Sequence, residues 1–221
     1  PRLAHKKCEA LNTAWHLFCQ YAELVVTVDA DTELEPEALA KWIAEFEENE
    51  NLAGSQAKFT MRGKALLTRL QKAEYALGID RALRRKKTTI LAGASSCYRN
   101  AALKAAMSDG RDGPWSYTSA VEDFELTYQF RRRGLRCIMS PSIRAYTDAM
   151  PNLKALKGQR LKWQTGTIND LIAWGMNRYS LESWLQQIVA LIFAGVWVMW
   201  LVWMGLILSA GGSVSIVGWW L

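Results

Sequence analysis

Two aspartates follow a short apolar segment and are the most distinctive residues of the sequence. Residues 25–28 (VVTV) are rich in β-branched side chains, which predicts a buried strand, and Asp29-Ala30-Asp31 follows directly. Side chains two residues apart on a strand point the same way, so the two carboxylates would repel each other without a cation between them. Mg²⁺ and Mn²⁺ take oxygen ligands and commonly bridge carboxylates to substrate phosphates. The pair therefore predicts a metal and diphosphate site at the carboxyl end of a strand, where open α/β sheets bind ligands.

The same residues have a simpler interpretation. The segment Asp29-Ala30-Asp31-Thr32 could form a turn that caps the next helix, because Asp and Thr favour such positions. Taken alone, the segment favours neither interpretation.

A second acidic pair, Glu122 and Asp123, follows a loop at 108–117 that contains Gly, Asp and Pro. Ser119 and Glu122 have the spacing of a capping box, which explains Glu122 as a partner of the Ser119 backbone. The capping-box spacing does not explain Asp123. An aspartate in the first turn of a helix gains from the helix dipole, but a carboxylate at the lip of a sheet could also act as a general base.

A third group of candidates lies in a basic stretch ahead of the apolar carboxyl-terminal part of the chain. Its sequence is Gln159-Arg160-Leu161-Lys162-Trp163. Arg and Lys suit phosphate oxygens, and Trp offers a flat apolar face to a sugar ring. The alternative is an amphipathic helix at a membrane surface with an interfacial Trp.

The elements that must position these residues alternate along the chain, which predicts an α/β domain. Strands are expected at 24–28, 53–59, 88–98 and 137–146, and helices at 7–20, 36–48, 64–87, 100–107, 122–133 and 153–174. The first strand follows a helix, whereas nucleotide-binding α/β domains normally start with a strand whose loop holds the base and ribose. We therefore expect the chain to be a fragment that lacks its amino-terminal strand.

Charge and hydropathy divide the chain of 221 residues into two regions, a mixed domain over 1–183 and a membrane region over 185–221. Residues 188–208 are uncharged, and at 1.5 Å per residue they reach roughly 30 Å, the thickness of a bilayer core. They predict a transmembrane helix, and 214–221 begins another apolar run. The formal charge of +6 comes wholly from the part before Leu185, which places that side in the cytoplasm.

The charge and the thiols also weigh against other classes of protein. A nucleic-acid binder would use the same positive charge, but the sequence has no recognition motif and has a membrane span. The four cysteines show no Cys-X-X-Cys spacing and read as reduced thiols in the cytosol. With only two histidines, a zinc site or a Ser-His-Asp triad has little support.

Five segments, in this order along the chain, resemble the motifs of family 2 glycosyltransferases with a GT-A fold, a Rossmann-like fold that binds nucleotide-diphosphate sugars. The segments are Lys7-Cys8-Glu9-Ala10-Leu11-Asn12, Asp29-Ala30-Asp31, Gly93 with Cys97-Tyr98-Arg99, Val121-Glu122-Asp123, and Gln159 to Trp163. A transmembrane region follows them, as in the membrane-embedded synthases of cellulose, chitin, hyaluronan and poly-N-acetylglucosamine. The resemblance covers residues 6–208.

The resemblance implies an inverting transfer of a sugar from a nucleotide sugar, usually linked to UDP, to a hydroxyl acceptor. Matched by position, Asp29 and Asp31 would hold Mg²⁺ or Mn²⁺ and the diphosphate, and Asp123 would be the general base. The remaining matched residues divide between the two substrates: Lys7, Gln159 and Arg160 would bind the donor, and Gly93, Glu122 and Trp163 the acceptor.

Two residues depart from the family pattern. Lys162 stands where Arg is usual, which keeps the charge but loses the planar two-pronged donor. Val121 replaces a Thr and removes a hydroxyl beside the expected base, a change more relevant to packing than to chemistry.

The resemblance leaves the acceptor open. The leading hypothesis is a synthase of the plasma or inner membrane that elongates a polysaccharide. The runner-up transfers a single sugar to a lipid such as a ceramide or a polyprenyl phosphate. A hypothesis of another class is a catalytically silent membrane scaffold, against which the intact Asp29, Asp31 and Asp123 argue.

Overall fold

The computed structural model describes residues 2–107 and 110–211, with side chains from Lys7 onward. The apolar run expected at 214–221 lies outside the described residues. The chain divides into two units, Pro1–Gly175 and Met176–Leu221, and each is described by itself.

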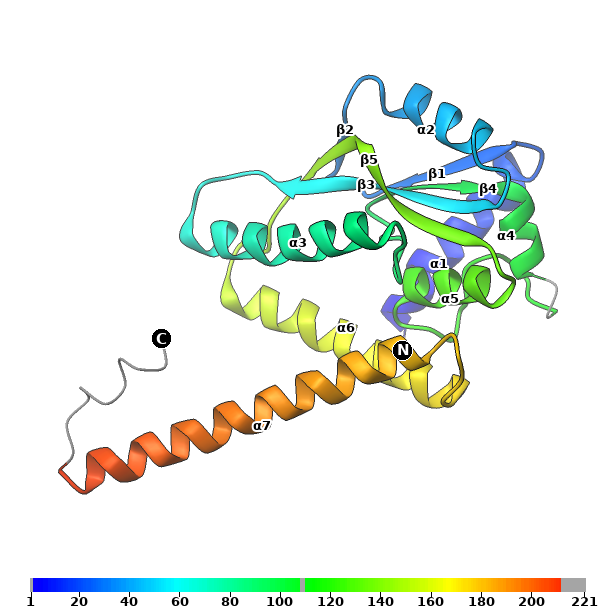
Figure 1. Ribbon diagram of the computed structural model, residues 1–221. Helices are drawn as coiled ribbons and strands as arrows, with labels where there is room; N and C mark the ends of the chain where they lie inside the picture. Colours follow the sequence, from blue (N-terminus) through cyan, green and yellow to red (C-terminus); the bar gives the residue numbers. More distant parts are fainter. Residues whose placement is uncertain (1, 108–109, 212–221) are drawn as a thin grey trace. The chain divides into compact units, whose positions relative to one another are not determined.

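The first unit contains a sheet with helices on both faces (Figure 1). Its strands are β1 (Leu24–Val28), β2 (Glu33–Leu34), β3 (Leu52–Met61), β4 (Ser95–Arg99) and β5 (Arg136–Thr147). Its helices are α1 (Arg2–Ala14), α2 (Ala38–Glu47), α3 (Leu66–Arg85), α4 (Asn100–Ala106), α5 (Glu122–Arg132) and α6 (Leu153–Trp174). A π-helical turn, Trp15–Cys19, extends α1.

The sheet has the strand order β1-β4-β3-β5-β2. Strands β3 and β5 run parallel, whereas the β1–β4, β3–β4 and β2–β5 pairs are antiparallel. The mixed α/β architecture that the sequence predicted is confirmed.

Two apolar clusters, one on each face of the sheet, hold the layers together. Helix α2 presents Ala38, Trp42 and Phe46 at intervals of four residues, which places all three on one helix face against the sheet. Strand β4 contributes to both clusters because neighbouring strand residues point to opposite faces: Cys97 packs on the α2 side and Tyr98 on the other.

Most elements lie where the sequence placed them, but the expected strand at 88–98 is shorter. Only Ser95–Arg99 is a strand, and 88–94 is irregular. The reason is that backbone N–H groups in this segment are bound by side chains rather than by a neighbouring strand. The donors are Leu91, Ala92 and Gly93, and their acceptors are Thr127 Oγ1, Gln56 Oε1 and Asp123 Oδ2.

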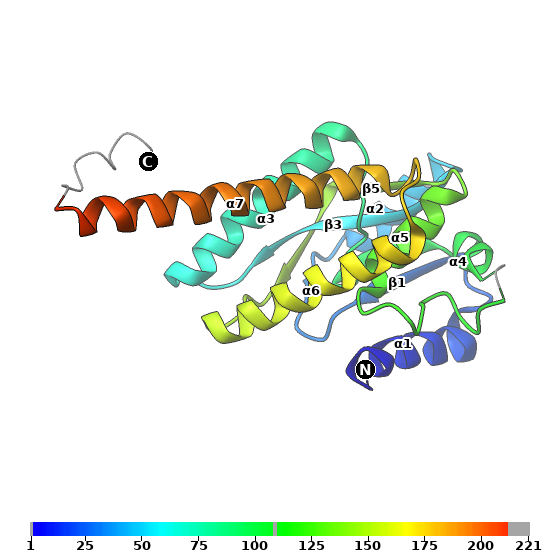
Figure 2. The same cartoon turned by 90° about the horizontal axis from the view of Figure 1, so that it is seen from below.

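The second unit contains one long helix, α7 (Leu181–Ser209), which includes the predicted span 188–208. Its 29 residues have a mean hydropathy of 2.3 in their most apolar stretch, and by length and composition they can cross a membrane. Figure 2 shows the helix in a second orientation.

Candidate active site

The carboxyl end of β1, the irregular segment 88–94, and parts of α1, α3, α5 and α6 surround a cavity of about 820 Å³ within the first unit. All nine residues singled out from the sequence line it: Lys7, Asp29, Asp31, Gly93, Glu122, Asp123, Gln159, Arg160 and Trp163. Residues from positions 7 to 163 of the chain therefore meet at one place.

Asp29 and Asp31 lie in a turn just after β1 rather than on the strand itself. The N–H of Thr32 donates to the carbonyl oxygen of Asp29 at 2.9 Å, which closes the turn. The turn does not cap the next helix, because α2 begins at Ala38 and its N-cap residue, Glu37, makes no side-chain cap. The turn interpretation is thus correct for the backbone, the capping role is wrong, and both carboxylates still face the cavity.

Lys7, Asp29, Gly93, Glu122 and Asp123 form a cluster that we call the charged corner. Lys7 Nζ lies 3.2 Å from Asp29 Oδ1 and 3.1 Å from Glu122 Oε1, so one ammonium joins two acidic segments. Burial opposes the charge on Lys7, but the attraction of Glu122 and Asp29 outweighs it and raises the pKa of Lys7 above its usual value. Lys7 stays cationic at any physiological pH.

Gly93 allows the charged corner to close. A β-carbon at this position would lie 3.1 Å from Lys7 Nζ, tighter than an ordinary contact. The Gly93 N–H instead donates to Asp123 Oδ2 at 3.3 Å. The small residue leaves room for Lys7 Nζ beside the backbone.

Asp123 lies in the first turn of α5. Its Oδ1 accepts the N–H of Phe124 at 2.8 Å, and its Oδ2 accepts from Gly93. Burial, followed by the charge of Glu122, raises the pKa of Asp123 above its usual value, although Lys7 and these two N–H groups act in the opposite direction. A carboxylate with a raised pKa is a stronger base than a free one, as proton abstraction from a hydroxyl requires.

Ser119 and Glu122 do not form the expected capping box. Helix α5 begins at Glu122 with Val121 as its N-cap residue, two residues later than a cap at Ser119 requires. Ser119 Oγ accepts the N–H of Val121 and donates to Asp170, while Glu122 pairs with Lys7. Glu122 forms the ion pair with Lys7 instead of the capping box because it is almost fully buried, and a buried carboxylate needs a charged partner.

Tyr75, Gln159, Arg160 and Trp163 form a second group, which we call the helical wall because α3 and α6 supply it. The Arg160 guanidinium lies 4.7 Å from the ring centroid of Trp163 and 5.4 Å from that of Tyr75. Arg160 also donates to Glu74 Oε2 at 2.7 Å. In this state the arginine is paired with the protein itself.

Unlike Arg160, Gln159 has a side-chain oxygen without a partner among the described residues, and Trp163 has an exposed ring surface. Gln159 Oε1 is buried and has no hydrogen-bond partner among the described residues. A buried oxygen of this kind is costly unless something satisfies it, and Gln159 lines the cavity. Trp163 keeps 36% of its surface exposed, so part of its ring is open to a ligand.

The two departures from the family pattern lie in different surroundings. Lys162 is exposed and lines the cavity, so its ammonium can still reach a ligand. Val121 is buried and packs against Gly166 of α6, in agreement with the expected packing role.

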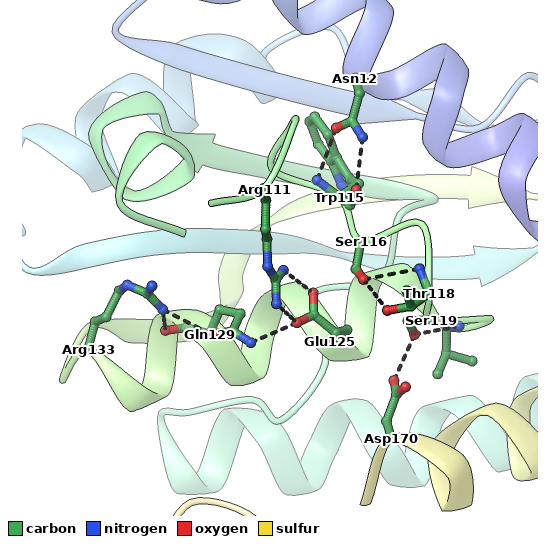
Figure 3. Close-up of polar contacts among 11 residues, drawn as sticks. Asn12, Arg111, Trp115, Ser116, Thr118, Ser119, Glu125, Gln129, Arg133 and Asp170 are labelled. Carbon is green, nitrogen blue, oxygen red and sulfur yellow. Dashed lines mark hydrogen bonds and ion pairs between the residues drawn. The ribbon is translucent and has the colours of Figure 1, made fainter. Parts of the chain in front are cut away.

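Several residues that complete the site could not be predicted from sequence motifs. Glu74 and Tyr75 lie in the basic helix α3, where no motif surrounds them, and they reach Arg160 only through helix packing. Thr147, at the end of β5, donates to Asp31 Oδ1 at 3.4 Å. Asn12 was part of a quoted motif without a role; its side-chain amide binds both the N–H and the carbonyl of Trp115 and holds the 110–118 loop (Figure 3).

A divalent metal would find two carboxylate oxygen donors here, from Asp29 and Asp31. Among the described residues no group of three or more His, Cys, Asp or Glu side chains could hold a metal by itself. Two carboxylates suit Mg²⁺ or Mn²⁺ in sites where substrate phosphates and water complete the coordination. The donor set therefore fits an ion that binds together with a phosphate ligand.

Comparison with known proteins places this geometry among sugar-transferring enzymes. The family model described as "Glycosyl transferase family group 2" matches residues 24–221. The chain is 26% identical over 167 residues to glucomannan 4-beta-mannosyltransferase 2 of Arabidopsis thaliana, which covers 73% of the chain and 30% of that protein. It is 22% identical over 160 residues to glucomannan 4-beta-mannosyltransferase 1 of Oryza sativa subsp. japonica, covering 70% of the chain and 30% of that protein. The chain thus spans about a third of the length of these relatives.

A solved structure has the same fold. The mannosyltransferase PcManGT from Pyrobaculum calidifontis, in complex with GDP-Man and Mn²⁺, matches with a TM-score of 0.56 and 17% identity. The match covers 76% of this chain and 44% of that one. It confirms the predicted GT-A fold.

Proposed function

The chain belongs to the family 2 glycosyltransferases, and we propose that its cavity transfers a sugar from a nucleotide-sugar donor to a growing polysaccharide, with inversion at the anomeric carbon. The observation that carries the proposal is the meeting of all nine predicted residues around one cavity of about 820 Å³. A site of this size is in the range of pockets that enclose small ligands.

The donor half of the proposed site combines the Asp29–Asp31 turn with the helical wall. Asp29 and Asp31 would hold Mg²⁺ or Mn²⁺, which when bound neutralises the charge that develops on the departing diphosphate. Lys7 supports the turn by its contact with Asp29. Gln159 has an unsatisfied oxygen and Arg160 a guanidinium within the same cavity, where a hydroxyl and phosphate oxygens would engage them.

The acceptor half centres on Asp123. Its carboxylate takes the proton of an acceptor hydroxyl while that oxygen attacks the anomeric carbon. The bond from this carbon to the diphosphate oxygen breaks, and the nucleoside diphosphate leaves with the electron pair. One displacement of this kind inverts the configuration and needs no covalent intermediate. Gly93 holds the base by a direct N–H contact, Glu122 is fixed beside it by its ion pair with Lys7, and the partly exposed Trp163 would support the acceptor sugar.

Two parts of the donor must be identified, its nucleotide base and its sugar. The family resemblance implies a donor that is usually linked to UDP, whereas the relatives are named as mannosyltransferases and the solved neighbour holds GDP-Man. A test must therefore include donors of both kinds. The runner-up, single transfer to a lipid acceptor, uses the same residues. A catalytically silent scaffold would not explain why Gln159 Oε1 is buried without a hydrogen-bond partner among the described residues.

We propose that the domain over 1–183 lies at the cytoplasmic face of a plasma or inner membrane and that residues 188–208 of α7 cross the bilayer. Helix α7 supplies a span of sufficient length, and the basic residues all precede it. Cys97 and Cys137 are buried, and burial raises the pKa of each thiol to about 12, so neither can report topology. A cysteine introduced at the exposed Lys104 should react with a membrane-impermeant reagent only after permeabilisation; reaction in sealed right-side-out vesicles would reverse the orientation.

The experiment that tests the proposed function measures the products formed by the membrane-bound protein from radiolabelled UDP-sugars and GDP-mannose. We expect a polymer or ladder with one of these donors, loss of product in chelator, and recovery with Mg²⁺ or Mn²⁺. A single glycolipid product would establish the runner-up. Absence of transfer from every donor, with correctly folded protein, would support the scaffold.

A further inference from the structure

One face of helix α6 carries residues of two kinds. Gln159, Trp163, Gly166, Asp170 and Trp174 are spaced four, three, four and four residues apart, so they lie along a single helix face. Gln159 and Trp163 line the cavity. The other three contact α5 and the segment just before it, as the distances below show.

Asp170 makes the polar contact of this face. Its Oδ2 accepts a hydrogen bond from Ser119 Oγ at 2.7 Å, and Ser119 Oγ in turn accepts the N–H of Val121 at 3.0 Å (Figure 3). Asp170 is only 8% exposed and Ser119 only 2%. A carboxylate on α6 is thus linked through one hydroxyl to the backbone that begins α5, two residues before Asp123.

Gly166 and Trp174 provide close packing on either side of Asp170. A β-carbon at Gly166 would lie 3.0 Å from Val121 Cγ1 and 3.3 Å from Ala120 Cβ, so the glycine allows the two backbones to come together. Trp174 stacks on Tyr128 of α5 with ring centroids 3.7 Å apart and an angle of 2° between the planes. These apolar contacts bring the helices together but are less directional than a hydrogen bond.

A buried carboxylate at this position is costly. Burial raises the pKa of Asp170 to about 6, and the charge of Glu125 acts in the same direction. The charged groups near Asp170 are Glu125, Arg111 and Asp123. Arg111 is committed to Glu125, which it binds through two hydrogen bonds of 2.8 and 2.5 Å. An apolar side chain would avoid this cost. We therefore expect the role of Asp170 to depend on its hydrogen bond with Ser119 and not on packing alone.

We propose that Asp170 is a positioning residue: its hydrogen bond with Ser119 fixes the rotation of α6 relative to the segment that carries Asp123. Trp163 lies seven residues before Asp170, roughly 10 Å along the helix, and Gln159 lies eleven residues before it, roughly 16 Å. Each residue of slip turns a helix by about 100°, so a slip would carry Gln159 and Trp163 away from the cavity. The bond thereby sets the donor and acceptor groups of α6 against the base. Its effect on catalysis rests on the proposed function, whereas the docking of α6 does not.

The test compares Asp170→Ala, Ser119→Ala, their combination and Asp170→Asn, with Asn169→Ala as the control on the exposed neighbouring position. Hydrogen exchange measured by mass spectrometry reports docking without any substrate. We expect faster exchange in both 119–124 and 153–170 for the two alanine variants, and exchange no faster than in the wild type for Asp170→Asn, whose amide oxygen can still accept from Ser119.

Kinetics provide the second readout. We expect each alanine variant to lose about 10- to 100-fold in kcat with little change in the donor KM, since misplacement of reacting groups lowers turnover. The double variant should be no worse than the single ones, because both remove the same bond. Asp170→Asn should restore most of the rate and Asn169→Ala should leave it unchanged.

Three results would overturn the proposal: additive losses in the double variant, an Asp170→Asn variant as impaired as Asp170→Ala, or unchanged exchange in 153–170 on removal of the bond. If Asp170→Ala does not fold, Ser119→Ala and Asp170→Asn still decide the matter. If the wild-type protein transfers no sugar, the proposed function fails, and the exchange data decide independently whether Asp170 docks α6.

Discussion

The charged corner and the helical wall line the same cavity, but they are held in different ways. In the charged corner, the functional groups bind one another: Lys7 joins Asp29 to Glu122, and Gly93 binds Asp123. In the helical wall, Arg160 is bound to Glu74 and Gln159 Oε1 has no partner among the described residues. The corner is therefore held by its own contacts, whereas the wall leaves one buried acceptor that the described protein groups do not satisfy.

The largest expected effect comes from removing the two carboxylates of the turn after β1, Asp29 of the charged corner and the neighbouring Asp31. Replacing Asp29 and Asp31 together by Asn removes both carboxylate donors for a divalent ion, which should cost several kcal/mol, on the order of 10³-fold in kcat/KM. Titration with Mn²⁺ in the transfer assay measures it, with Asp112→Asn as an exposed control. A double variant that keeps wild-type activity and metal response would show that Asp29 and Asp31 hold no metal.

Asp170 joins the wall to the segment that carries the corner, and its raised pKa gives a prediction about stability. Since the folded-state pKa, about 6, lies above the usual 3.8, the folded protein binds the proton more tightly. The contribution of Asp170 to stability is therefore fully present below about pH 3.8 and is lost as the pH rises through about 6. Asp170→Asn should raise the free energy of unfolding at pH 8 by up to about 3 kcal/mol and change it little at pH 4. Chemical unfolding at the two pH values measures the difference; equal effects at both would contradict the assignment.

Lys7 is the cation inside the corner, and removing it should sharpen the contrast with the wall. Lys7→Met leaves Asp29 and Glu122 without their shared partner, and we expect a loss of about tenfold in kcat/KM. Because Lys7 lowers the pKa of Asp123, the variant should also move the acid limb of the pH–rate profile to higher pH. Lys104→Met, on the surface of α4, is the control. An acid limb that does not move would separate Lys7 from Asp123.

The smallest effect concerns the wall. Glu74→Gln removes the protein's own partner of Arg160 and should lower the donor KM a few-fold, by no more than about 1 kcal/mol, the range of exposed ion pairs. The stability of the fold should change by a similar or smaller amount. Asp80→Asn breaks a comparable pair with Arg84 on the same helix and serves as the control. A rise in the donor KM would mean that Glu74 orients Arg160 for binding instead of withholding it.

The corner could be predicted from the sequence more completely than the wall. Asp29, Asp31 and Asp123 follow short local patterns, and the order of the motifs along the chain predicted that they meet. The partners of Arg160 could not be predicted in this way. Glu74 is 86 residues away from Arg160, and nothing in the composition of α3 or α6 determines how these two helices pack.

The docking face of α6 has a signal in the sequence, whereas the irregular segment 88–94 has none. The spacing of Gln159, Trp163, Gly166, Asp170 and Trp174 marks one face of α6 and thus a docking face. Residues 88–94 contain Ile90 and Leu91, which favour a strand, but this segment gives its N–H groups to the side chains of Gln56, Asp123 and Thr127. Those acceptors lie on other elements, so strand propensity alone could not reveal the competition.

The most direct test of the central claim, that Asp123 is the base of a preorganised glycosyl-transfer site, is the Asp123→Asn variant measured for donor binding and turnover in parallel. Asn keeps the shape of the side chain but cannot take a proton at neutral pH. The prediction is donor affinity close to that of the wild type, with transfer reduced on the order of 10²- to 10³-fold. Transfer at a near-normal rate, or a parallel loss of donor binding and turnover, would contradict it.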